Sequence, residues 1–444
     1  MNIKNFFSKR SFSYFFILGL ISILIFIFIY FSIPIYFFDF NKNKEVVITY
    51  ADNISAAHQI VVDKFNEEYK GKIRVETINL PFSKFSTNER KELLTRSLRS
   101  KSAKLDVFAI DLIWSARFAK WAEPLEKYIH ENEVKKLLPK ALESCLISDT
   151  LIALPMYLDI SILYYRRDLI QALENGKIIE EKLKNSITWD DFFTLSKQFK
   201  NEKNPFYLFP ADNYEGLVCS FIEVLLNQNP EFFHSDTLNW QSEEISKSFS
   251  LLNKIINEKN LTPQIVTDYR ETQCYDMFVY DDGIFLRGWS SFPKDSKALL
   301  ESIQKGNLIE QAALPHIKGS NPMSTIGGWN IMLSKYSEHK QEAFEFIKYI
   351  VREESQKIYY NEGAFMPVIS SIYKDEQFCK EHPNLLKTKV FLDHGIHRPF
   401  LDNYTKISDV ISYYANKVLK NQLTVEKAVN NTYQSLISGE LILR

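Results

Sequence analysis

The chain has few cysteines, and their number and spacing exclude two kinds of scaffold. Four occur among 444 residues: Cys145, Cys219, Cys274 and Cys379. No two are close enough in sequence to form the paired-cysteine motif of a structural zinc site. A chain of this length also buries enough apolar surface to fold without a disulfide framework. We interpret all four as small buried hydrophobic residues, although a single bridge remains open in an oxidising compartment.

An excess of charge of either sign is also missing. Lysine and arginine number 54 and aspartate and glutamate 55, which gives a net charge of -1. Because there is no basic field, nucleic acid is excluded as a partner. Neither a P-loop nor a GxSxG elbow occurs, so any ATPase must be another chain. His394 and His397 have no supporting third ligand, so we expect no metal site and no cofactor.

One long apolar run lies near the N-terminus. Phe12 to Phe38 carries no charge and is longer than the about 20 residues that cross a bilayer. Basic residues precede it, which predicts a cytoplasmic N-terminus and an exported remainder. Its exit, Pro34 to Asp39, has no small-x-small cleavage pattern, and no cysteine follows for a lipid. We expect residues 1–40 to form an uncleaved transmembrane anchor, with a cleaved signal peptide as the alternative.

Strand and helix patterns alternate after this run. The predicted strands are Val46–Tyr50, Ile73–Leu80 and Asp106–Asp111, and a helical pattern follows each of the first two. This order is typical of a parallel sheet with helices on both faces. Ligands bind beyond the carboxyl ends of such strands, so Ala51 to Ile54 and Asp111 are expected at one crevice. Later extended segments, Gly283–Leu286 and Ala312–Leu314, could rejoin this sheet and make two lobes discontinuous in sequence.

Six short blocks, taken in order, carry a resemblance to a known family. They are Asp106–Trp114, Ala153–Asp159, Leu163–Leu169, Tyr214–Cys219, Gly327–Ile331 with Ser334–Ser337, and Arg398–Pro399 before Tyr404 and Ile407. From about Val46 to the C-terminus, the chain resembles the bacterial extracellular solute-binding proteins, which include the maltose- and trehalose/maltose-binding proteins. The loop Ala51–Ser55 departs from the trehalose/maltose branch, because it is two residues shorter and differently charged. The absence of a lipid-attachment cysteine is a second departure.

The resemblance implies an α/β two-lobed periplasmic-binding-protein fold of type II, with discontinuous lobes joined by crossover strands. We expect the N-terminal lobe at residues 41–154 and 290–330, and the C-terminal lobe at 155–289 and 331–444. It also implies a monomer that is not an enzyme. Such a protein closes on a sugar and delivers it to the membrane permease subunits of an ABC transporter. The expected location is extracytoplasmic, in the periplasm or at the cell surface.

The same resemblance implies a set of sugar-contacting residues. They are Arg90, Asp111, Tyr157, Asp159, Trp289, Gly327, Gly328, Trp329 and Arg398. These residue types suit a sugar, because carboxylates and guanidinium groups hydrogen-bond to hydroxyls and aromatic rings pack on the C–H face. Glycines let the backbone approach a ligand closely.

Each residue type also has an ordinary structural explanation. Asp111 could cap the helix that follows it, and Asp159 could pair with a neighbouring arginine. Trp289 could belong to the core. Gly327–Gly328 could form a turn, and Arg90 could lie on a solvated helix face.

Two other functions remain open from the sequence. An anchored sugar sensor would use the same fold to signal to a membrane partner. A glycoside hydrolase would need an acid and a base roughly 5 to 10 Å apart, for which Asp111 and Asp159 are candidates. Formation of new reducing ends would identify a hydrolase. A neighbouring kinase gene would favour the sensor, and neighbouring permease genes the importer.

Overall fold

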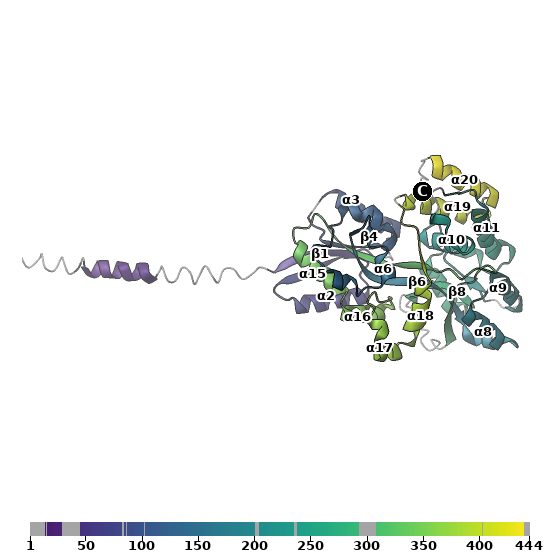
Figure 1. Cartoon of the computed structure of the whole chain (residues 1–444), viewed down its shortest axis with the longest axis horizontal. Coiled ribbons are helices and arrows are strands. Elements are labelled where there is room, and N and C mark those ends of the chain that lie inside the picture. Colours follow the sequence, from purple (N-terminus) through teal and green to yellow (C-terminus); the bar gives the residue numbers. More distant parts are fainter. Residues whose placement is uncertain are drawn as a thin grey trace, which may run out of the picture.

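Helices surround a mixed, nine-stranded sheet in the folded part of the chain (Figure 1). The computed structural model describes residues 14, 16–28, 45–81, 84–85, 87–101, 103–199, 204–234, 238–292, 308–401 and 403–438. The strand order is β2-β1-β3-β10-β6-β8-β7, with β11 beside β10 and β9 beside β6. The polypeptide is therefore an α/β protein, as its sequence pattern predicts.

The first part of this sheet is the predicted parallel unit. β1 (Val46–Asp52) pairs in parallel with β2 (Ile73–Asn79) and with β3 (Val107–Asp111). α2 (Ala56–Glu68) and α3 (Thr87–Arg99) make the connections. α2 buries Ala57, Val61 and Phe65, the apolar stripe at steps of four. The carboxyl ends of β1 and β3 thus lie at the same edge of the sheet, as expected.

Two long strands continue the sheet into a second group of strands. β6 (Leu154–Arg166) pairs through its N-terminal half with β10 (Thr325–Leu333), and β10 pairs with β3. The C-terminal half of β6 pairs with β8 (Phe285–Trp289) and β9 (Ile309–Ala312). β7 (Tyr207–Leu208) lies beyond β8, and β11 (Ile396–His397) pairs with the start of β10. β4 (Leu146–Ile147) and β5 (Thr150–Leu151) form a separate hairpin.

Gly283–Leu286 and Ala312–Leu314 do not pair with the strands of the parallel unit, β1, β2 and β3. Phe285 and Leu286 belong to β8, and Ala312 belongs to β9, so both segments lie at the far end of β6. The strand that returns to β3 is β10. Nearly all residues of β10 are buried. Because buried strands occur in both groups of strands, this burial does not predict which strand β10 pairs with.

A second group of helices surrounds the far end of the sheet (Figure 1). These helices are α8 (Gly176–Asn185), α9 (Trp189–Leu195), α10 (Glu215–Gln228), α11 (Glu243–Asn253), α12 (Glu271–Tyr280), α19 (Tyr404–Leu419) and α20 (Val425–Ser438). α10 is buried on almost every face and packs on α11 and α19. The predicted cap of α9 is confirmed, because the Thr188 side chain accepts a hydrogen bond from the Asp191 N–H.

Further helices lie in the connections between these elements. They are α4 (Ser115–Phe118), α5 (Glu131–Val134), α6 (Pro139–Leu142), α7 (Arg167–Gln171), α17 (Glu376–Glu381) and α18 (Pro383–Asp393).

The chain returns to the first group of strands after β10. α15 (Lys340–Ile350) and α16 (Glu353–Gly363) pack on α2 and β1. The Phe346 ring lies 5.1 Å from that of Phe65, centroid to centroid, and Arg352 Nη1 donates to Glu68 at 2.8 Å.

These contacts place α15 and α16 beside the first lobe, although the sequence prediction assigned 331–444 to the second. Likewise β9, within the predicted first-lobe segment 290–330, pairs with the C-terminal half of β6. An apolar helix stripe does not specify which sheet it will cover.

The predicted transmembrane helix, Phe12 to Phe38, lies partly outside the described residues. Within it, residues 14 and 16–28 are helical and their side chains are exposed. Across the part of the chain that the structure describes, no helix is both long and apolar enough to cross a membrane. The structure therefore does not confirm this part of the predicted fold.

Candidate functional site

The crossover strands bring five of the predicted residues into adjacent register. Trp329 on β10 lies opposite Asp111 on one side and Tyr157 on the other, and Gly327 lies opposite Asp159. On the other edge of β6, Trp289 ends β8 opposite Ser161. The two groups of strands therefore meet where the predicted residues gather.

Gly327 and Gly328 lie inside β10, so they do not form the ordinary turn that their composition allowed. A Cβ at Gly327 would lie 2.9 Å from Cζ3 of Trp289. Gly328 has φ +138°, and a Cβ there would lie 2.5 Å from the carbonyl oxygen of Tyr157. Glycine is thus required at one position by the Trp289 ring and at the other by the backbone conformation and by β6.

Arg90 is buried, not part of a solvated helix face. It is 1% exposed, and its Nη2 donates to Asp52 Oδ1 at 2.8 Å. Its guanidinium carbon lies 4.2 Å from the centroid of the Trp329 ring, within the range of a cation–π interaction. The helix α3 therefore delivers a fixed cation to the Trp329 side chain.

Asp52 is the centre of a small polar cluster that includes Arg90. Besides Arg90, it accepts hydrogen bonds from the Tyr50 hydroxyl and from the N–H of Asn53, both at 2.6 Å. His58 Nε2 lies 3.4 Å from Asp52 Oδ2, and burial lowers the pKa of His58 although Asp52 opposes the change. The sequence indicated this loop as part of the crevice, but it did not single out Asp52 as the partner of Arg90.

Arg398 joins the two groups of strands and helices. Its Nη2 donates to Asp111 Oδ1 and its Nη1 to Glu215 Oε1, both at 2.8 Å. Glu215, in the first turn of α10, also accepts from the hydroxyls of Tyr404 and Ser408. Arg398 is 2% exposed, so this ion pair is shielded from water and each member depends on the others.

Asp111 combines the two roles that the sequence left open. Its Oδ1 accepts from the Ile113 N–H at 3.1 Å, so it caps the short 3-10 helix Leu112–Trp114, and it also binds Arg398. Burial raises the pKa of Asp111, whereas Arg398 acts in the opposite direction and Glu215 adds to the increase.

Asp159 does not pair with a neighbouring arginine. It accepts from the Ser291 hydroxyl at 2.8 Å, from the Ser291 N–H at 3.2 Å and from the Ser290 hydroxyl. Burial raises its pKa, while these serine hydrogen bonds lower it. In this structure the carboxylate therefore fixes the segment that follows Trp289.

Trp289 is half-buried, so it is not simply a core residue. Its backbone N–H donates to the Tyr275 hydroxyl at 3.1 Å, and its carbonyl accepts from the Tyr164 hydroxyl at 2.9 Å. The indole Nε1 donates to Glu271 Oε1 at 3.3 Å. Backbone and ring are thus both held in place.

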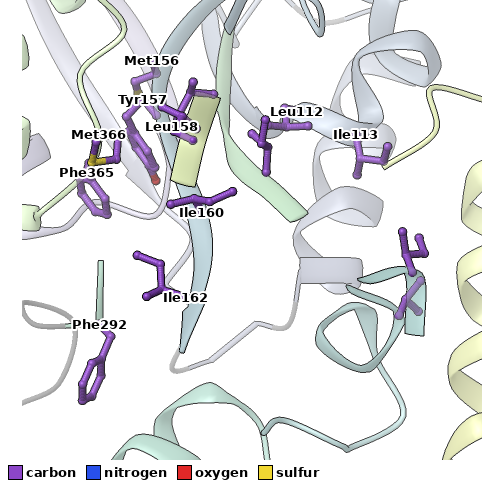
Figure 2. Packing of buried hydrophobic residues seen from close by; sticks show 14 of the residues in the cluster. Leu112, Ile113, Met156, Tyr157, Leu158, Ile160, Ile162, Phe292, Phe365 and Met366 are labelled. Atoms are coloured by element: carbon purple, nitrogen blue, oxygen red, sulfur yellow. The ribbon is translucent and has the colours of Figure 1, made fainter. Parts of the chain in front are cut away.

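The Tyr157 ring belongs to an aromatic cluster (Figure 2). It stacks on Phe365 with ring centroids 4.1 Å apart and an interplanar angle of 13°. Tyr157 is 5% exposed, so its ring packs chiefly against protein.

Two further charged residues near Trp289 were missed from the sequence. Arg287 Nη2 donates to Glu223 Oε1 at 2.7 Å, and the Arg287 guanidinium lies 4.5 Å from the centroid of the Trp289 ring. The available signal was an arginine in the apolar run of β8, because a buried charge requires a partner. Glu215 lies in one of the blocks that carry the family resemblance, but its role was not predicted.

The described residues contain no group of three or more histidine, cysteine, aspartate or glutamate side chains that could hold a metal ion. His397 Nε2 lies 2.8 Å from the Lys140 carbonyl oxygen, and burial lowers the pKa of His397 to about 4. All four cysteines are free thiols, three of them buried and Cys379 partly buried.

A sheet shared by two lobes, with aromatic and charged side chains gathered at the crossover strands, defines a ligand-binding protein of the two-lobed α/β class. Residues 50–357 match the family described as bacterial extracellular solute-binding protein, so the chain belongs to that family. This membership makes it a solute-binding protein that acts outside the cytoplasm.

Two relatives show how far the similarity extends. A probable ABC transporter-binding protein of Deinococcus radiodurans is 26% identical over 345 residues, which cover 75% of this chain and 79% of that protein. A mannitol-binding protein of Pseudomonas aeruginosa is 31% identical over 88 residues, 19% of this chain and 20% of that one.

Solved structures support the predicted fold. The maltose-bound MalE3 of T. maritima has a TM-score of 0.79 and 25% identity, covering 89% of this chain and 100% of that one. A Listeria monocytogenes ABC substrate-binding protein, solved with cycloalternan, has a TM-score of 0.72 and 17% identity, with 90% and 100% covered. The T. maritima protein is similar to this chain in sequence as well as in fold, whereas the similarity to the L. monocytogenes protein concerns the fold alone. The two-lobed periplasmic-binding-protein fold is confirmed.

Proposed function

We propose that this chain captures a sugar or oligosaccharide between its lobes and delivers it to the permease subunits of an ABC transporter. The position of Trp329 carries the proposal. This half-buried indole lies in register between Asp111 and Tyr157, with the Arg90 guanidinium over its ring. A partly exposed aromatic face beside buried charged groups suits the C–H face and hydroxyl rim of a pyranose.

The relatives favour the same class of ligand. The T. maritima protein is maltose-bound, and the D. radiodurans protein is a probable ABC transporter-binding protein. The ligand set that we propose comprises Arg90, Asp111, Tyr157, Asp159, Trp289, Gly327, Gly328, Trp329 and Arg398. Sugar contacts shared between lobes favour the closed form, so binding shifts the population towards closure.

We propose a division of the chain that follows these contacts. The first lobe comprises residues 41–154 with β10, α15 and α16, and the second contains β7, β8, β9 and the helices around them. The protein works as a monomer, and a separate ATPase powers the permease.

Membrane attachment is a further part of this proposal. The uncharged run from Phe12 to Phe38 is long enough to span a bilayer, and basic residues precede it. Extraction of membranes with alkaline carbonate should leave the full-length chain in the pellet. Recovery of an exported domain that starts near Asp39 in the supernatant would show that the segment is cleaved.

Hydrolysis is the less favoured alternative. A hydrolase needs a carboxylic acid and a carboxylate that are free to act on the substrate. Here Asp111 binds Arg398 and Asp159 accepts from two serines. Incubation with maltotriose should produce no new reducing ends. Turnover that disappears in Asp159→Asn would establish an enzyme instead.

A thermal-shift screen tests the binding proposal directly. The exported part, from about Asn41, should melt at higher temperature with one or more sugars from a panel that includes maltose, trehalose, mannitol and cycloalternan. A ligand present at about 100 times its dissociation constant adds about 2.7 kcal/mol of stability. No shift with any sugar, combined with a shift by amino acids or peptides, would contradict the proposed ligand class.

A further inference from the structure

Trp329 and Trp289 each lie against a buried arginine that is itself paired with a buried carboxylate. In the first lobe, Arg90 contacts Trp329 and binds Asp52. At the end of β8, Arg287 contacts Trp289 and binds Glu223. The two triads share no residue and come from different elements, yet they repeat the same arrangement.

The Arg287–Glu223 pair is well connected. Arg287 Nη2 donates to Glu223 Oε1 at 2.7 Å and its Nε to Oε2 at 3.3 Å. Thr325, the first residue of β10, donates its hydroxyl to Glu223 at 2.5 Å. The Ser161 hydroxyl on β6 accepts from the Thr325 N–H at 2.9 Å. The Arg287 side chain is therefore attached to α10 and, through Glu223, to both crossover strands.

Stability alone does not explain this pair. Arg287 is 0% exposed and Glu223 7% exposed, and the desolvation of two such charges costs about as much as their attraction returns. Replacing such a pair by apolar residues of similar volume is often neutral or stabilising. What an apolar pair cannot supply is a planar cation beside an indole, which fixes the ring by a cation–π interaction.

We propose that Arg287 and Glu223 are positioning residues that fix the indole of Trp289 for stacking against the sugar. This inference rests on the proposed function. Trp289 is half-buried while Arg287 is fully buried, so the arginine lies on the protein side of the ring. A ring that is already ordered loses less conformational freedom when the ligand binds, which raises affinity without a further direct contact.

A thermodynamic cycle between the ion pair and Trp289 tests the inference. Calorimetric titration with maltose, or with the sugar that gives the largest thermal shift, should be done on four proteins: wild type, Arg287→Met/Glu223→Gln, Trp289→Ala and the triple variant. Removing both charges avoids leaving one buried and unpaired. The double variant should bind roughly 3- to 30-fold more weakly. The triple variant should bind no more weakly than Trp289→Ala, because Arg287 acts through that ring.

The control is a second buried arginine of the same lobe. Arg166 is 7% exposed and binds Asp168 and Asp282 at the end of β6. Arg166→Met/Asp168→Asn should lower the melting temperature and leave affinity unchanged. If Arg287→Met/Glu223→Gln does not fold, Arg287→Lys replaces it in the thermodynamic cycle with Trp289→Ala. This substitution keeps the ion pair and removes the planar group.

The possible results separate the two proposals. Suppose that the wild type binds sugar. If the affinity losses of Arg287→Met/Glu223→Gln and Trp289→Ala add in the triple variant, or if Arg287→Met/Glu223→Gln binds normally, the positioning role is wrong and the proposed sugar site stands. If the wild type binds none of the sugars, the proposed function fails and this inference fails with it.

Discussion

Arg398 and Asp111 are joined by a hydrogen bond of 2.8 Å, although one follows β11 and the other ends β3. The same guanidinium binds Glu215 at the start of α10. Charged side chains from three separate stretches of sequence therefore meet in one buried cluster. Because Asp111 belongs to the first lobe and Glu215 to the second, Arg398 is the cation that links them.

Removing this cation should be costly. Arg398→Met leaves the carboxylates of Glu215 and Asp111 buried without a cation, so we expect the free energy of unfolding to fall by about 3–5 kcal/mol. Urea denaturation followed by circular dichroism measures the change. The control is Arg352→Met, because Arg352 is 42% exposed where it binds Glu68, and exposed pairs contribute about 0–1 kcal/mol. Equal losses of unfolding free energy in the two variants would show that Arg398 contributes no more than an exposed arginine.

Truncation of Trp329 should weaken sugar binding without unfolding the chain. Trp329→Ala removes a stacking face, and we expect a loss of about 1–3 kcal/mol in binding free energy from the apolar contact. Asp111→Ala should cost at least as much if its carboxylate binds the sugar. Trp240→Ala is the control, because Trp240 packs on Phe232 in the second lobe. That variant should lose stability and keep its affinity; the reverse pattern would place the site elsewhere.

A single methyl group at Gly327 should act through Trp289. The added Cβ of Gly327→Ala would lie 2.9 Å from Cζ3 of Trp289, which forces the indole to move. Sugar affinity should therefore fall, and calorimetric titration measures the effect. In a Trp289→Ala background the methyl group meets no ring, so the same substitution should have little further effect. An undiminished loss in that background would mean that the backbone of β10, not the ring, is disturbed.

Asp159 should make stability depend on pH. Burial raises its pKa from the ordinary value of 3.8, although hydrogen bonds from Ser290 and Ser291 oppose the increase. The folded state then keeps a proton that the unfolded state has lost, so this contribution to stability falls as pH rises from about 3.8 through the raised pKa.

Melting temperatures of the wild type and Asp159→Asn over this range of pH provide the measurement. The amide resembles the protonated acid, so the wild type should lose stability relative to the variant as pH rises. If the difference in melting temperature between wild type and Asp159→Asn does not change with pH, Asp159 titrates alike in the folded and unfolded states.

The sequence predicted local structure better than it predicted which distant segments pack against each other. The β1–α2–β2 unit, the Thr188 cap and the end of β3 at Asp111 follow from patterns within a few residues. The return of β10 to β3 does not, because it joins segments more than 200 residues apart along the chain. The packing of α15 and α16 on α2 was not predicted, for the same reason.

The candidate site shows the same limit. The family resemblance predicted that Arg90, Asp111 and Arg398 contact a sugar, and it named no protein partner for them. The structure shows that each binds a charged side chain of the protein itself. Those pairings depend on tertiary contacts that no spacing in the sequence expresses, and for the same reason the Arg287–Glu223 pair was missed.

The pairing of β3 with β10 has a consequence for how the chain folds. Val107 and Leu333 are neighbours in the sheet, so the first lobe cannot complete its sheet until three quarters of the polypeptide has been made. Contacts of such large sequence separation slow folding. A ribosome-bound chain that lacks β10 therefore keeps the β3 edge unpaired, and remains without its native sheet for most of its synthesis. Delayed folding of this kind is what a polypeptide needs if it must pass through a membrane channel unfolded.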